Sequence, residues 1–241
     1  MTKVTISEQG GVRNLHLDSP WIQGSMRLAE PDAIELEYVQ QMMMWMLFMP
    51  APRHIVQLGL GAGALTKFCY RYFPQSDVTA VELNPAVIAT CHSMFALPAC
   101  DARLDVLNCD ATDFVADPAF REGIDILQVD LYGENATRPA VDTPEFYRDC
   151  ASCLTPEGML TVNLLGSEPI RQHSLAALDQ AFEAIAWLPR TVDGNLIAIG
   201  FKSAPEVDFE VLYERAAKIE DATGLPAESW VRGLESWMMG S

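Results

Sequence analysis

Three glycines and one carboxylate of this chain could together bind a nucleoside. Gly59, Gly61 and Gly63 follow directly after an apolar run and stand before a stretch of helical character. Glycines in such a turn let a ligand approach the backbone closely, with the N-terminus of the helix facing it. Glu82 ends the next apolar run, 19 residues after Gly63, where a carboxylate can accept hydrogen bonds from both hydroxyls of a ribose. A tight turn and a helix-capping acid would explain the same residues without a ligand.

Two more acids follow apolar runs in the same way. Asp110 is followed by Ala111, and Asp130 comes two residues before Tyr132. The carboxyl ends of parallel strands line the ligand crevice of an open sheet, so both acids are expected on one rim with Glu82. Such a rim suits a ligand that has hydroxyls, an exocyclic amine and a positive charge, as an adenosyl sulfonium does. Asp130 could also accept the proton of an attacking amine, or could merely anchor a loop.

The elements that must position these residues alternate regularly from residue 54 onward. Apolar stretches predict strands at 54–58, 78–82, 104–108, 124–130 and 159–163, and helices are predicted at 64–73, 85–95, 144–153 and 169–184. This alternation is typical of an α/β protein with a mostly parallel sheet covered on both faces. The last two apolar stretches, 185–192 and 196–202, are separated by three residues only, which predicts an antiparallel hairpin.

The terminal hairpin separates two nucleotide-binding folds. The glycine pattern also fits the fingerprint of dinucleotide enzymes, whose sheet continues in parallel. A parallel sheet that ends in an antiparallel hairpin is typical of the Rossmann-like methyltransferase fold, which binds S-adenosylmethionine. We therefore expect this α/β fold rather than an NAD-binding one.

The two ends of the chain are expected to add smaller elements. Residues 4–28 alternate around Gly10 and Gly11, which predicts short antiparallel strands. Asp32 and Glu35 resemble the start of a helix that would end near Met49, with a methionine-rich second half that packs in the core. Helices are predicted again at 210–223 and 228–239. The expected organisation is a small N-terminal β-hairpin region (1–30) and a Rossmann-like domain with C-terminal helices (31–241).

Composition limits the partners and the compartment. The 241 residues carry a formal net charge of -17, which disfavours nucleic acid. The longest apolar run, at 42–52, is shorter than the about 20 residues that cross a bilayer. Without an apolar leader at the start, we expect a cytoplasmic protein that has no membrane partner. Six cysteines are scattered, and Cys150 with Cys153 lacks a second ligand pair, so no metal site is expected.

Four motifs in order carry a family resemblance. The segments 56–63, 81–88, 109–111 and 129–130, the last with 143–147 downstream, are similar to the consecutive motifs of spermidine synthases, and the likeness runs from about residue 11 to 202. It implies a cytoplasmic transferase that moves an aminopropyl group from decarboxylated S-adenosylmethionine to a small cationic amine, a polyamine such as putrescine. A homodimer is implied as well.

The resemblance also implies roles for single residues. Glu82 would hold the ribose, Asp110 with Ala111 would contact the adenine, and Asp130 would receive or steer the proton of the attacking amine. Gln23 resembles the glutamine that closes over the cofactor, and Tyr38 resembles a tyrosine of the substrate channel. Tyr132 and Glu134 are the further candidates for substrate binding.

Three positions differ from the family pattern. Ala62 stands where the glycine loop usually has an Asp for the aminopropyl amine, Gly133 replaces a second Asp, and Val39 follows Tyr38 in place of a polar residue. Gln57 occupies a position where many methyltransferases have an acid. Three hypotheses follow: an aminopropyltransferase, a methyltransferase that uses intact S-adenosylmethionine on the same scaffold, and an adenosyl-binding protein without turnover.

Overall fold

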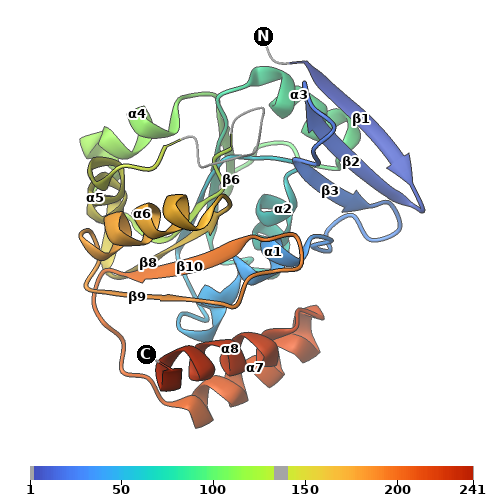
Figure 1. The fold of residues 1–241 in the computed structure, drawn as a ribbon. Coiled ribbons are helices and arrows are strands. Elements are labelled where there is room, and N and C mark those ends of the chain that lie inside the picture. The colour runs from blue at the N-terminus through green and yellow to red at the C-terminus, as the bar shows by residue number, and fades with distance from the viewer. Residues whose placement is uncertain (1–2, 133–140, 241) are drawn as a thin grey trace.

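A seven-stranded sheet forms the centre of the computed structural model, which describes residues 3–132 and 141–240 (Figure 1). The order across the sheet is β6-β5-β4-β7-β8-β10-β9. The pairs from β6 to β8 are parallel, and β10 is antiparallel to both β8 and β9. The strands are β4 (His54–Leu58), β5 (Asp77–Val81), β6 (Leu104–Leu107), β7 (Ile124–Val129), β8 (Leu154–Leu164), β9 (Ala184–Trp187) and β10 (Leu196–Phe201). The predicted fold class, mostly parallel with a terminal antiparallel pair, is confirmed.

Helices cover both faces of the sheet because neighbouring residues of its strands point in opposite directions. Ile55 and Ile126 belong to one core cluster, together with residues of the two C-terminal helices. Val56 and Leu127, the next residue in each strand, belong to the opposite cluster. The helices are α2 (Ala64–Tyr72), α3 (Pro85–Met94), α4 (Ala111–Ala116), α5 (Pro144–Cys153), α6 (Glu168–Asp179), α7 (Phe209–Thr223) and α8 (Ala227–Gly240). None of them, in the part of the chain that the structure describes, is long and apolar enough to cross a membrane.

The connection between β9 and β10 is longer than the sequence predicts. β9 ends at Trp187, and residues 188–195 join it to β10 in place of a three-residue turn. Pro189 lies just beyond the end of β9 and has no backbone N–H for the ladder, which explains the early end of the strand. The longer connection reaches over the carboxyl rim of the sheet and brings Asn195 to it.

The predicted single helix from Asp32 to Met49 is wrong. The structure has a short helix α1 (Glu37–Gln41) and a 3-10 helix (Met44–Leu47) instead. Asp32 and Glu35 do not cap a helix but form ion pairs with Arg71 and Arg27.

The break between these two helices has a physical reason. The carbonyl of Met42 accepts hydrogen bonds from the buried side chains of Gln128 (3.2 Å) and Thr161 (3.1 Å), which satisfy it outside a helix. Met42, Met43 and Met44 are each 0% exposed, so the predicted packing role of the methionines is confirmed.

The N-terminal strands form a separate antiparallel sheet in the order β1-β2-β3, as the alternation of residues 4–28 predicts. Gly10 (φ 59°) and Gly11 (φ 79°) make the two-residue turn between β1 (Val4–Gln9) and β2 (Val12–Leu17), where both positions require a positive φ. β3 (Gly24–Arg27) then crosses the glycine loop of the large sheet. The division of the chain at residue 30 stays a prediction.

Candidate functional site

A cavity of about 1150 Å³ follows the carboxyl rim of the large sheet. It extends from Asp110, after β6, past Glu82 and the glycine loop, to Asp130 after β7 and Asn195 before β10. The volume is large enough for a drug-sized ligand and a second small molecule. The three acids that the sequence places at strand ends therefore lie in one cavity.

Two of the three loop glycines line this cavity. Gly59 has a φ of 94° and Gly61 a φ of 52°, a region that glycine adopts without strain. A Cβ on Gly59 would lie 2.2 Å from the carbonyl oxygen of Asp130, so the glycine lets the ends of β4 and β7 approach each other. Gly63 (φ 71°) is instead the N-cap residue of α2 and sets the start of that helix.

Glu82 is fixed at the glycine loop by backbone groups. Its carboxylate accepts hydrogen bonds from the N–H of Leu60 (3.1 Å) and of Asn84 (2.8 Å). Burial raises the pKa of this carboxyl, and these hydrogen bonds oppose that rise. Glu82 lines the cavity, and because a carboxylate has about four acceptor sites it keeps the capacity to accept a hydroxyl.

Asp110 and Ala111 form the start of α4, a helix that the sequence pattern does not predict. Asp110 accepts hydrogen bonds from the N–H (2.7 Å) and the hydroxyl (2.5 Å) of Thr112 on the same oxygen, and these bonds lower its pKa. Both residues line the cavity at the end nearest β6.

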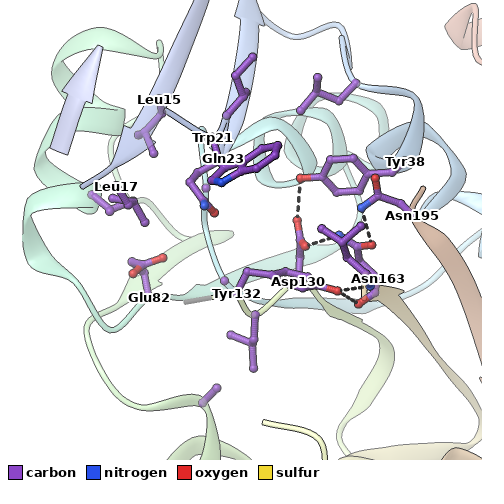
Figure 2. Close-up of a pocket in the computed structure, with 18 of the residues that line it drawn as sticks. Leu15, Leu17, Trp21, Gln23, Tyr38, Glu82, Asp130, Tyr132, Asn163 and Asn195 are labelled. Carbon is purple, nitrogen blue, oxygen red and sulfur yellow. Dashed lines mark hydrogen bonds between the residues drawn. The ribbon is translucent and has the colours of Figure 1, made fainter. Parts of the chain in front are cut away.

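Asp130 is the centre of a side-chain network (Figure 2). The hydroxyl of Tyr38 donates to its Oδ2 (3.2 Å), and the amide of Asn163 donates to its Oδ1 (3.0 Å). The amide of Asn195 in turn donates to Asn163 Oδ1 (2.9 Å). Burial raises the pKa of Asp130, and the bonds from Asn163 and Tyr38 act in the opposite direction. Burial is also the main cause of the raised pKa of Tyr38.

The hydroxyl of Tyr132 supports the same network through two hydrogen bonds to the backbone. Its hydroxyl donates to the carbonyl of Asn163 (2.6 Å) and accepts from the N–H of Leu165 (2.6 Å). Burial raises the pKa of this phenol, so it stays protonated and keeps both bonds. Tyr132 lines the cavity, while Glu134, predicted beside it, lies outside the described residues.

Asn163 and Asn195 are site residues that sequence reasoning missed. They are 3% and 6% exposed, and a buried amide side chain needs partners. The signal was available at Asn163, a polar residue at the rim end of an apolar strand. Asn195 gives no such signal, because Asp, Gly and Asn are common turn residues and a turn accounts for all three.

Gln23 reaches the cavity from the loop before β3. Its backbone N–H donates to the carbonyl of Leu15 (2.8 Å). Its side-chain Nε2 is buried and has no hydrogen bond partner among the residues that the structure describes. An unpaired buried amide costs about 1 to 3 kcal/mol, so an acceptor atom of a ligand is expected there.

Of the positions that depart from the family pattern, Ala62 and Val39 lie in the core, and Gly133 lies outside the described residues. Ala62 is 2% exposed and Val39 is 5% exposed. Gln40 donates to the carbonyl of Ile34 (2.7 Å) and does not line the cavity. Gln57 is 0% exposed and pairs with Gln128 in the interior, so it does not mark a ligand site. Gly133 lies in the segment 133–140.

The far end of the cavity carries both signs of charge. Arg171, Arg190 and Asp193 line it together with Asn195. Arg171 forms an ion pair with Glu168 (2.5 Å) at the start of α6. Within the described ranges, no group of three His, Cys, Asp or Glu side chains could hold a metal ion. Cys150 and Cys153, the one close pair in the sequence, are buried free thiols.

Comparisons with known proteins concern the family and the fold of the chain. The family model of the spermine/spermidine synthase domain matches residues 35–188. A polyamine aminopropyltransferase of Neisseria meningitidis is 34% identical over 238 residues, which cover 97% of this chain and 89% of that protein. Two solved structures share the fold at 22% identity. A probable spermidine synthase from Corynebacterium glutamicum has a TM-score of 0.74 and covers 95% of this chain and 88% of its own. Human methyltransferase-like protein 13 in complex with SAH has a TM-score of 0.66, with 83% and 93% covered.

Proposed function

This chain belongs to the spermine/spermidine synthase family, and from that premise we propose that it transfers the aminopropyl group of decarboxylated S-adenosylmethionine to an amine such as putrescine. The single observation that carries the proposal is the position of Asp130. Its half-buried carboxylate lies in the cavity between the glycine loop and the far end that would take the acceptor. The chain is accordingly a transferase whose substrates are small molecules.

The nucleoside end of the cavity supports the binding of an adenosyl donor. We assign the ribose hydroxyls to Glu82, and the adenine to Asp110 with Ala111. Gly59 and Gly61 let the donor approach the backbone, and Gly63 sets the α2 N-terminus that faces it. We assign the unpaired side-chain amide of Gln23 to the donor as well.

The reaction needs alignment and one proton transfer. An alkylamine with a pKa of about 10 must lose a proton before its nitrogen can attack the carbon beside the sulfonium. The new C–N bond forms as the C–S bond breaks, the electron pair of that bond returns to sulfur, and methylthioadenosine leaves. Asp130 takes the amine proton and passes it to solvent. Tyr38 and Asn163 each hold one of its oxygens, which fixes the direction of the carboxylate.

The acceptor would enter from the far end of the cavity. We place its chain against Tyr38 and Tyr132, and Glu134 stays a candidate for its second ammonium group. The acidic surface of the chain, with its formal net charge of -17, would favour the approach of a cationic amine. A cytoplasmic homodimer also stays a proposal, which light scattering of the purified protein would test.

Methyl transfer is the second candidate, and one observation favours it. Ala62 is sealed beneath β3, so the glycine loop supplies no carboxylate for the ammonium of a decarboxylated donor. The decisive experiment incubates the protein and putrescine with each donor in turn, and quantifies the products. Methylthioadenosine and spermidine from the decarboxylated donor are expected. S-adenosylhomocysteine from the intact donor would establish methyl transfer instead, and binding without either product would leave an adenosyl-binding protein.

A further inference from the structure

The indole of Trp21 has no role in the function proposed above, although it lies in the middle of the site. Trp21 is 63% exposed, whereas Trp45 is 0% exposed. It lines the same cavity as Glu82 and Asp130, and in the view of Figure 2 it lies beside Gln23, above both acids. A large apolar side chain that stays exposed inside a ligand cavity is expected to contact the ligand.

Two hydrogen bonds to β2 hold the loop that carries Trp21, residues 18–23 between β2 and β3. The carbonyl of Trp21 accepts a hydrogen bond from His16 Nδ1 (3.1 Å), which must carry the proton because a carbonyl only accepts. Two residues later the N–H of Gln23 donates to the carbonyl of Leu15 (2.8 Å). These bonds fix the backbone from Trp21 to Gln23, so the ring is presented to the cavity with little loss of entropy on binding.

The donor brings two positive charges, an ammonium and a sulfonium, and the glycine loop has no carboxylate for either of them. A Cβ on Gly24 would lie 2.5 Å from the backbone nitrogen of Ala62 and 2.7 Å from its Cβ, so β3 closes directly over this position. Asp130 is held by two hydrogen bonds and is needed by the acceptor amine. Glu82 accepts backbone bonds at the ribose position. Another group must therefore stabilise the sulfonium.

We infer that the face of the Trp21 indole binds the sulfonium of the donor through a cation–π contact. Indole is the best aromatic partner for a cation, and the contact needs no carboxylate close to the reacting carbon. The inference rests on the proposed function and names the part of the donor that Trp21 recognises. Because the sulfur loses its charge when the C–S bond breaks, the contact weakens once the thioether product has formed. Trp21 thus distinguishes donor from product.

A matched pair of ligands isolates the charge. Decarboxylated S-adenosylmethionine and decarboxylated S-adenosylhomocysteine differ only by the methyl group and the sulfonium charge. We expect Trp21→Leu to weaken the sulfonium ligand about 5- to 20-fold and the thioether less than about 2-fold in calorimetry. Trp21→Phe should fall between wild type and Leu. Trp237→Phe is the control, since Trp237 packs on Trp187 (ring centroids 5.0 Å apart) and does not line the cavity.

The outcomes separate this inference from the proposed function. An equal loss for both ligands would mean that Trp21 packs on the adenosine, and no loss for either would mean that it has no contact; each result overturns the inference alone. Wild-type protein that binds neither ligand would refute the proposed function itself. Tryptophan fluorescence gives a second readout, since the change on ligand binding should vanish in Trp21→Phe and persist in Trp237→Phe.

Discussion

The two ends of the cavity are built in different ways. At the nucleoside end, Glu82 directly follows β5 and Asp110 lies in the turn after β6, and each accepts a hydrogen bond from the backbone N–H two residues later. At the acceptor end, Asp130, Asn163 and Asn195 come from segments far apart in the sequence and bond to one another through their side chains. In the first arrangement, these local bonds need only a strand and the turn after it, although Glu82 also accepts from the N–H of Leu60 in the neighbouring glycine loop. The second exists only after β7, β8 and β10 have paired.

The charges at the two ends differ as well. The charged side chains that line the nucleoside end within the described residues are carboxylates, whereas Arg171 and Arg190 accompany Asp193 at the other end. A donor with hydroxyls, an amine and a sulfonium suits the first set. The second set includes guanidinium groups, so a diamine gains less there from simple attraction. The charges of the nucleoside end thus follow from the fold, whereas those of the acceptor end would depend on the particular substrate.

The largest effect should come from the residue between the two ends. Asp130→Asn keeps the shape of the side chain but cannot accept the amine proton, so kcat should fall about 100-fold or more. The donor Kd should change less than about 3-fold, since Tyr38 can accept from the new amide as readily as it donates to the carboxylate. Steady-state kinetics and calorimetry check both values. Equal losses in kcat and in donor affinity would make Asp130 a binding residue only.

The next effect sharpens the assignment of the nucleoside end. Glu82→Ala removes the acceptor of two ribose hydroxyls and should weaken methylthioadenosine at least about tenfold, with a smaller effect on kcat at saturating donor. Calorimetry measures the affinity. Asp105→Ala is the matched control, because Asp105 is an exposed acid on the neighbouring strand β6. Unchanged affinity in Glu82→Ala would remove this residue from the site, and tighter binding of NAD would overturn the class of ligand.

A smaller effect should come from the amide pair beside Asp130. Asn163 donates to the Asp130 carboxylate and lowers its pKa, against the rise that burial causes. Asn163→Leu removes the donor, so the Asp130 pKa should rise and the acid limb of the kcat/KM profile should move to higher pH. Activity at neutral pH should fall about tenfold.

Asn195→Leu tests whether the effect passes along the chain of amides. Asn195 donates a hydrogen bond to Asn163. The acid limb of the kcat/KM profile of Asn195→Leu should therefore move in the same direction as in Asn163→Leu, by a smaller amount. A loss of activity in either variant with an unmoved limb would mean that the amides only support the fold.

The sequence predicts the nucleoside end well because its signals are local. Gly59, Glu82 and Asp110 are each recognisable from a strand and the few residues after it, and the structure places all three in one cavity. The same holds for the sheet, whose strands are apolar runs. Local signals fail where tertiary partners outweigh them, as in the segment 32–49, where the carbonyl of Met42 bonds to distant side chains instead of continuing a helix.

The acceptor end could not be predicted in the same way. The sequence indicates only a turn at Asn195 and only a short β region at Trp21. The topology places both residues at the cavity. The charge of Arg190 has no local signal at all, because its position depends on the length of the 188–195 connection.

The smallest expected effect tests whether these charges select the acceptor. Arg190 and Asp193 are both exposed and line the cavity, and Arg190 also interacts electrostatically with Glu168. A guanidinium near a diamine repels its second ammonium, so Arg190→Gln should lower the KM for putrescine about 2- to 3-fold, and Asp193→Asn should raise it by a similar factor. Both changes should shrink at high ionic strength, because exposed charges are screened. Donor affinity and kcat should stay at wild-type values in both variants, which serve as controls for each other because their charges change in opposite directions. A shift of the same sign in both would show that the loop shape, and not its charge, governs the acceptor end.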